Sequence, residues 1–164
     1  MRRLLVLILV VAVLAGCDPG APSTLDNRAD LTESELVGTW QNTAHNAVLV
    51  FEEDGRFAAT VLPHQVFEGI PGVLPDGFDP ERDTLDGSGQ WSLGASREDR
   101  DGPRNLVTLH LRRLAGRTLA GSVELRAEKE GSSPVLAFYL GDPDLGNRYV
   151  YRKCQAGCPT VAPR

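Results

Sequence analysis

The stretch NAVLVFEEDGRFAATVL, residues 46–62, decides the fold class. Apolar and polar residues alternate on both sides of Asp54-Gly55, a pattern typical of two β-strands joined by a tight turn. A two-residue turn would place Phe51 and Phe57 on opposite faces of the hairpin. A three-residue loop ending at Gly55, with the glycine in the left-handed conformation, gives one wholly apolar face, and we expect this loop because the register of a hairpin follows its buried face. That face consists of Leu49, Phe51, Phe57, Ala59 and Val61.

The same alternation recurs along the chain, with turn-forming residues between the apolar runs. The expected strands are 37–42, 46–52, 56–62, 89–93, 105–111, 118–125, 134–140 and 147–153. One buried and one polar face per strand is typical of an antiparallel sheet. Eight strands with short links favour an all-β, eight-stranded antiparallel up-and-down barrel, which leaves no strand edge exposed. A β-sandwich is the alternative, because strand count does not separate the two folds.

The N-terminus has the pattern of an export signal. Arg2 and Arg3 precede a wholly apolar run, Leu4 to Ala15, which is too short to span a membrane. Leu14-Ala15-Gly16-Cys17 follows and resembles the lipobox of bacterial lipoproteins. The resemblance implies cleavage before Cys17 and diacylglycerol on its thiol, with the protein on the extracytoplasmic face of the cell membrane.

The expected organisation has four parts. A lipoprotein signal peptide occupies residues 1–16, a lipidated flexible tether 17–31, the barrel domain 32–158 and a C-terminal tail 159–164. Two of the 17 basic residues lie in the signal, so 15 remain against 22 acidic ones, a formal charge of −7. This balance argues against nucleic acid as a partner and against direct attraction to anionic lipid, so attachment would rest on the lipid at Cys17.

Two cysteines remain besides Cys17. Cys154 and Cys158 lie in a short Gly-containing segment, and an exported chain favours a disulfide between them. Free thiols and a metal site are the alternatives, and a metal would need further ligands. We expect no bound metal and no cofactor.

One connection is far longer than the usual loop. Residues 63–87 separate two expected strands and carry several large apolar side chains. The loop either packs over one barrel end as a plug or forms a lid that binds a partner. The side chains in question are Val66, Phe67, Ile70, Leu74 and Phe78, together with Val73.

Gly38-Thr39-Trp40, at the start of the first strand, resembles the Gly-x-Trp motif of lipocalins and other calycins. In that family the tryptophan closes one barrel end and packs against an arginine near the last strand. The resemblance implies a barrel-closing role for Trp40, with Arg148 or Arg152 as the stacking cation. Lipocalins have their long loop after the first strand, whereas here it follows the third.

A broader resemblance covers most of the expected domain. The segments 36–40, 52–60, 87–93 and 138–153 are similar to uncharacterised actinobacterial lipoproteins with a lipocalin-like barrel. That group has no assigned activity, so the resemblance implies location and fold alone.

The sequence contains no recognisable catalytic motif, and we expect no enzyme. His45, His64 and His110 lack metal-ligand spacing, and neither a nucleophile elbow nor a phosphate-binding loop is present. The run from Gly141 to Asn147 has two aspartates but lacks the further ligands of a calcium loop, so we expect a hairpin turn.

Three functions therefore stay open at this point, and the third, an enzyme whose site assembles from residues distant in the sequence, is the one that we do not expect. The first is a non-catalytic barrel that binds a protein partner or has a structural role in the cell envelope. The second is a calycin-like module that holds a small apolar ligand inside the barrel. We favour the first, because no polar side chains converge on the expected interior to orient a ligand.

Overall fold

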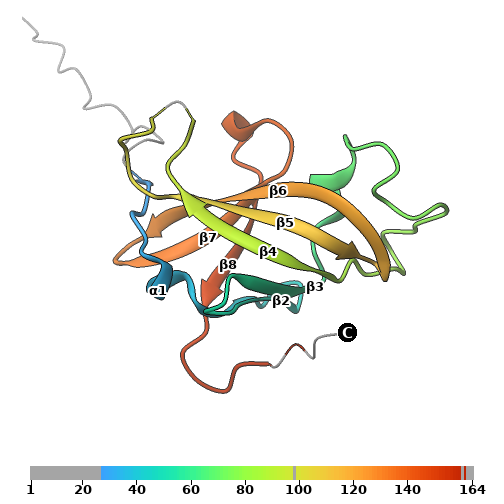
Figure 1. The fold of residues 1–164 in the computed structure, drawn as a ribbon, viewed down its shortest axis with the longest axis horizontal. Helices are drawn as coiled ribbons and strands as arrows, with labels where there is room; N and C mark the ends of the chain where they lie inside the picture. Colours follow the sequence, from blue (N-terminus) through green and yellow to red (C-terminus); the bar gives the residue numbers. More distant parts are fainter. Residues whose placement is uncertain (1–26, 98, 160, 162–164) are drawn as a thin grey trace, which may run out of the picture.

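A computed structural model of the protein describes residues 27–97, 99–159 and 161. The expected signal segment and Cys17 lie outside these residues. The strands, drawn in Figure 1, are β1 (Gly38–Asn42), β2 (Ala47–Phe51), β3 (Arg56–Thr60), β4 (Gly87–Gly94), β5 (Leu106–Leu114), β6 (Arg117–Glu130), β7 (Ser133–Tyr139) and β8 (Arg148–Lys153). The helices are α1 (Glu33–Leu36) and two 3₁₀ turns, η2 (His64–Phe67) and η3 (Pro143–Leu145).

The strands form a closed barrel in chain order. Each strand pairs antiparallel with the next, and β8 closes the sheet on β1 through Trp40 opposite Lys153 and Gln41 opposite Arg152. The eight-stranded barrel predicted from the alternation is confirmed, and the sandwich is not formed. Closure removes the two free edges that an open sheet would leave.

The register of the first hairpin is also confirmed. Phe51 lies opposite Phe57, and Leu49 lies opposite Ala59, as the three-residue loop requires. Gly55 has φ +81°, the left-handed conformation that glycine adopts without steric cost. The strand ends earlier than expected, at Thr60, because Val61 turns to φ +53° and donates its N–H to Asp86 Oδ1.

The helix α1 prepares one end of the barrel for Trp40. Thr32 caps it in a reciprocal capping box with Glu35, as the spacing predicted. The carbonyl of Leu36 then accepts a hydrogen bond from Trp40 Nε1 at 2.8 Å, and the tryptophan is fully buried. Trp40 therefore sits at the α1 end of the barrel interior with its one polar atom satisfied.

The cation over Trp40 is Lys153, which corrects our expectation of Arg148 or Arg152. Lys153 Nζ lies 5.5 Å from the centroid of the indole ring. Side chains alternate along β8, so Lys153 shares a face with Tyr149 and Tyr151, whereas the two arginines point outward. On the outer face Arg148 pairs with Glu128, and Arg152 pairs with Glu130.

The segment before α1 belongs to the folded barrel. Ala29 N–H donates to the carbonyl of Ala127 at 3.0 Å, and Leu31 N–H donates to the carbonyl of Arg104. Both apolar side chains are buried. The packed chain therefore begins no later than Ala29, ahead of the domain boundary that we expected at residue 32.

Large side chains occupy the barrel interior. Rings and branched chains from every strand except β4 form one buried cluster, with Trp40 at one end and Phe67 from η2 in it; Trp91 and Leu93 of β4 are partly buried and pack against it. An eight-stranded barrel is just wide enough to be filled in this way. The largest fully buried side chains on the strands are Trp40, Phe51, Phe138, Tyr151, Leu49, Leu109, Leu114, Leu125 and Leu136.

Candidate functional site

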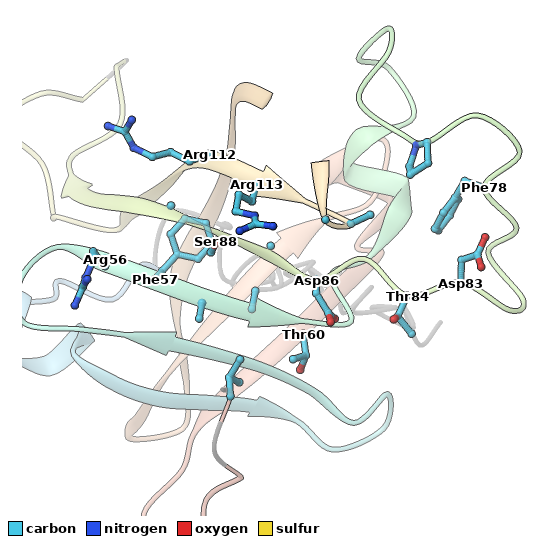
Figure 2. Close-up of a pocket in the computed structure, with 18 of the residues that line it drawn as sticks. Arg56, Phe57, Thr60, Phe78, Asp83, Thr84, Asp86, Ser88, Arg112 and Arg113 are labelled. Atoms are coloured by element: carbon cyan, nitrogen blue, oxygen red, sulfur yellow. The ribbon is translucent and has the colours of Figure 1, made fainter. Parts of the chain in front are cut away.

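A cavity of about 1160 Å³ lies on the outside of the barrel wall. It runs over the outer faces of β3, β4 and β5 and is bounded by the loop from Pro75 to Asp86, as Figure 2 shows. We call it the outer groove. The side chains used below to define it are Arg56, Ala58, Phe78, Ser88, Arg112 and Arg113.

Small residues make the floor of the outer groove. Ala58 on β3 lies opposite Ser88 on β4, and Gly89 follows Ser88. A Cβ atom at Gly89 would come within 2.0 Å of the carbonyl oxygen of His110, a backbone atom of the neighbouring strand. The close approach of β4 to β5 at this point therefore requires glycine.

That close approach coincides with a β-bulge in β5. Ser88 pairs with Arg113 and Gly89 pairs with Leu111, so Arg112 is an extra residue in the ladder. Leu111 and Leu114 are both buried, whereas the two arginines between them are exposed. A bulge thus places two consecutive side chains on the outer face, where regular alternation would turn one of them inward.

Two further arginines line the outer groove, and both are neutralised. Arg56 forms ion pairs with Glu52 at 3.0 Å and with Asp54 at 2.8 Å. Arg82 pairs with Asp79 at 3.2 Å. These pairs lie at the groove rim and hold the guanidinium groups against the protein's own carboxylates.

Arg112 and Arg113 have no such carboxylate. Arg112 Nη2 donates to the side-chain carbonyl of Gln90 at 3.0 Å, a neutral partner. In the part of the chain that the structure describes, no acidic side chain lies within ion-pair distance of either arginine. Figure 2 shows Arg113 near Ser88, its partner on β4, and Arg112 projecting from β5 in another direction. Both are exposed cations in a groove that Glu52, Asp83 and Asp86 also line.

The aspartates of the groove accept hydrogen bonds from the backbone of the long loop. Asp86 Oδ1 accepts from the N–H of Val61 at 3.3 Å, and Asp83 Oδ2 accepts from the N–H of Asp79 at 2.9 Å. Their oxygens are therefore used to fix the loop that forms one wall.

The wall opposite the arginines is apolar. Phe78, half-buried, packs against the core cluster, and its N–H donates to the carbonyl of Pro75 at 3.1 Å. Ala115, at the turn between β5 and β6, lines the same side of the outer groove. The groove therefore offers a positively charged side and an apolar side across a floor of small residues.

The barrel interior contains aromatic residues but no converging polar groups. Tyr149 stacks on His45 with ring centroids 4.7 Å apart and donates its hydroxyl to the carbonyl of Val61. Burial raises the pKa of Tyr149 to about 12 and raises the pKa of Tyr151 further. The Tyr151 hydroxyl is buried with no hydrogen-bond partner among the described residues.

The long loop packs over one barrel end. Phe67 is fully buried, and Val66, Val73, Leu74 and Phe78 contact the core, whereas Ile70 is 37% exposed. The loop ends are tied together by the bond from Leu62 N–H to the carbonyl of Leu85. The loop thus has the packing expected of a plug, and part of it also forms the wall of the outer groove.

The other residues singled out in the sequence do not come together. Cys154 and Cys158 form the expected disulfide just after β8. His45, His64 and His110 lie apart, on the β1–β2 turn, η2 and β5. Residues 141–147 form the expected turn around η3, with Asp142 capping it. No group of metal-binding side chains occurs among the described residues.

Sequence reasoning missed Arg112 and Arg113 as site residues. The sequence does contain a signal for them, which is a break in the alternation of buried and exposed residues along β5. Buried positions recur every second residue at Val107, Leu109 and Leu111, and the next buried leucine is Leu114. A slip of one residue within an alternating strand predicts a bulge, and the two arginines lie at the slip.

The fold and the site define a class of protein. It is a closed, eight-stranded antiparallel β-barrel with a groove on its outer wall that is lined by charged and apolar side chains. No protein-family model matches the chain, and neither a curated protein nor a solved structure matches it. Within the described residues, no helix is long and apolar enough to cross a membrane.

Proposed function

We propose that the protein is a lipid-anchored, non-catalytic binding module of the bacterial cell envelope, and that it binds a partner through the outer groove. The lipid would be diacylglycerol on Cys17, and the barrel would stand on the extracytoplasmic face of the cell membrane. The observation that carries this proposal is that the barrel interior is filled, while the cavity lined by charged side chains lies on the outside.

The position of the groove supports a macromolecular partner. A module for a small apolar ligand would enclose it in a pocket that buries most of the ligand surface. Here the interior residues Trp40, Phe51 and Phe138 are at most 1% exposed. The outer groove is instead open along the wall, which suits a segment of a larger molecule.

The folded chain also supports attachment by a short tether. Ala29 already packs on the barrel, so 11 residues (18–28) separate it from Cys17. Such a segment spans at most roughly 40 Å when fully extended. The barrel would therefore be held close to the membrane surface, beside partners embedded in the envelope.

Anchoring is tested by replacing Cys17 with serine. Cys17→Ser is expected to abolish labelling by a radioactive fatty acid and to move the protein from the membrane fraction to the soluble fraction. A variant that stays in the membrane fraction would show that anchoring does not depend on this thiol. Cys154→Ser is the control, because it removes a cysteine without touching the lipobox.

Partner binding is tested by photo-crosslinking in intact cells of the native source. A photoreactive residue at Thr84, exposed at the groove, is expected to give a discrete crosslinked product. The same residue at Glu124, exposed on the outer face of β6, is the control and should give none. Equal crosslinking at both positions, or at neither, would count against the groove as the binding surface.

A further inference from the structure

We propose, on the basis of the partner-binding function above, that Arg112 and Arg113 each bind a carboxylate of the partner. The outer groove would then take an extended, acidic peptide segment in which an aspartate or glutamate stands next to an apolar residue. One carboxylate would lie against each guanidinium group, and the apolar residue against Phe78 and Ala115.

The local backbone holds the two arginines ready for such a ligand. The bulge in β5 turns both side chains to the groove face, and Gly89 allows β4 to approach closely enough to keep the bulge. Arg113 lies opposite Ser88 on the groove floor. Their position therefore depends on the barrel wall itself, which is more rigid than a surface loop.

Electrostatics identifies the ligand group as an anion. Both guanidinium groups are exposed, and neither has a carboxylate partner in the described structure. Guanidinium groups bind carboxylates through paired, charge-assisted hydrogen bonds. A carboxylate bound to each arginine would supply those bonds.

The rest of the groove favours a peptide over a phosphate polymer. Binding to a nucleic acid or a similar polyanion needs many free cations along the surface. The other groove arginines, Arg56 and Arg82, are already paired with the protein's own carboxylates. The two arginines without a carboxylate partner, across the groove from Pro75 and Phe78, suit acidic side chains that have an apolar neighbour.

The test follows the arginine Nε–Hε signals by NMR during titration. The protein is the mature chain, residues 17–164 with Cys17→Ser, which retains every described residue. The probe is a blocked five-residue peptide of alternating leucine and glutamate. We expect saturable shifts of the Arg112 and Arg113 signals, and no shift for the exposed Arg97 and Arg100, which lie in the β4–β5 loop.

Two comparison ligands and three variants sharpen the result. The same peptide with glutamine in place of glutamate, and inorganic phosphate, are both expected to bind at least about tenfold more weakly than the acidic peptide. Arg112→Gln and Arg113→Gln should each weaken binding of the acidic peptide by about tenfold or more, whereas Arg97→Gln should leave it within about twofold.

Three results would overturn the proposal: no shift at roughly 10 mM acidic peptide, equal shifts at Arg97 and Arg100, or phosphate binding as tightly as the peptide. The double variant Arg112→Lys with Arg113→Lys keeps the charge and loses the planar fork, so it should bind with intermediate affinity. None of these measurements uses the lipid or the cell envelope. A negative result in the peptide titration would therefore leave the proposed function to be judged separately, by the Cys17→Ser variant and by crosslinking at Thr84.

Discussion

Replacement of Gly89 by alanine tests the link between the barrel wall and the outer groove. The added Cβ would lie 2.0 Å from the carbonyl oxygen of His110 and 3.0 Å from the amide nitrogen of Arg112. Both are backbone atoms of β5, so neither can move aside by changing a side-chain rotamer. Relief requires that β4 and β5 separate where Gly89 pairs with Leu111.

We expect Gly89→Ala to lower the free energy of unfolding by about 1–3 kcal/mol or more, the usual cost of overpacking a tight site. For a chain of this size the midpoint of thermal unfolding should fall by roughly 3–10 °C. Circular dichroism during heating measures that midpoint. The Arg112 and Arg113 Nε–Hε signals should also move, because the bulge that positions them is displaced.

The matched control is Gly94→Ala on the same strand. A Cβ at Gly94 meets no atom within 4 Å, and its φ lies outside the left-handed region. This variant should unfold within about 0.5 kcal/mol of the native protein. If Gly89→Ala were as stable as Gly94→Ala, the close approach of β4 to β5 could not be what holds the bulge, and the reasoning would be refuted.

Three other predictions follow. Tyr151→Phe should raise the free energy of unfolding by about 1 kcal/mol, because it removes a buried hydroxyl with no partner; chemical denaturation measures the change. Burial raises the pKa of Tyr149 to about 12, so the stabilisation that its neutral form provides is complete below pH 10 and is lost as the pH rises toward 12. Absorbance of tyrosinate at alkaline pH should therefore increase together with loss of the circular dichroism of the fold. Removing the disulfide with Cys154→Ser and Cys158→Ser should cost about 2 kcal/mol by the chain-entropy relation for so short a loop, measured by thermal unfolding.

Each of these three predictions has a result that would contradict it. A less stable Tyr151→Phe would mean that a water molecule or a ligand satisfies the hydroxyl inside the barrel. Tyrosinate that forms near pH 10 while the fold persists would contradict the burial of Tyr149. Unchanged stability without the disulfide would mean that the bridge lies outside the cooperative unit.

The barrel itself was predictable because a strand repeats every two residues. Phe51 and Phe57 could share a face only with a three-residue loop, and burial of that face fixed the register. The same logic found the strands that contain Trp91, Leu109 and Leu125. Closure of the sheet by β8 on β1 was predicted from the number of strands and their short links, and the sandwich stayed open as the alternative because alternation describes each strand but not its partner.

The candidate site was harder to predict, since it depends on departures from that repeat. Arg112 and Arg113 share the outer face only because one residue is inserted in the ladder, and Gly89 has its role only through the backbone of a neighbouring strand. The cation over Trp40 was misassigned for a related reason. The choice among Arg148, Arg152 and Lys153 depends on which residues of β8 face the barrel interior. The two expected arginines face outward.

Native mass spectrometry of the mature chain, purified from its native cells after export, tests the central claim most directly. A solid barrel whose binding surface lies outside predicts the mass of the mature chain with its covalent lipid on Cys17 and no further bound molecule, two hydrogens lighter than the reduced form because Cys154 and Cys158 are joined. A reproducible, non-covalently bound apolar molecule of a few hundred daltons, retained when Arg112 and Arg113 are replaced by glutamine, would contradict it. That result would place the ligand inside the barrel.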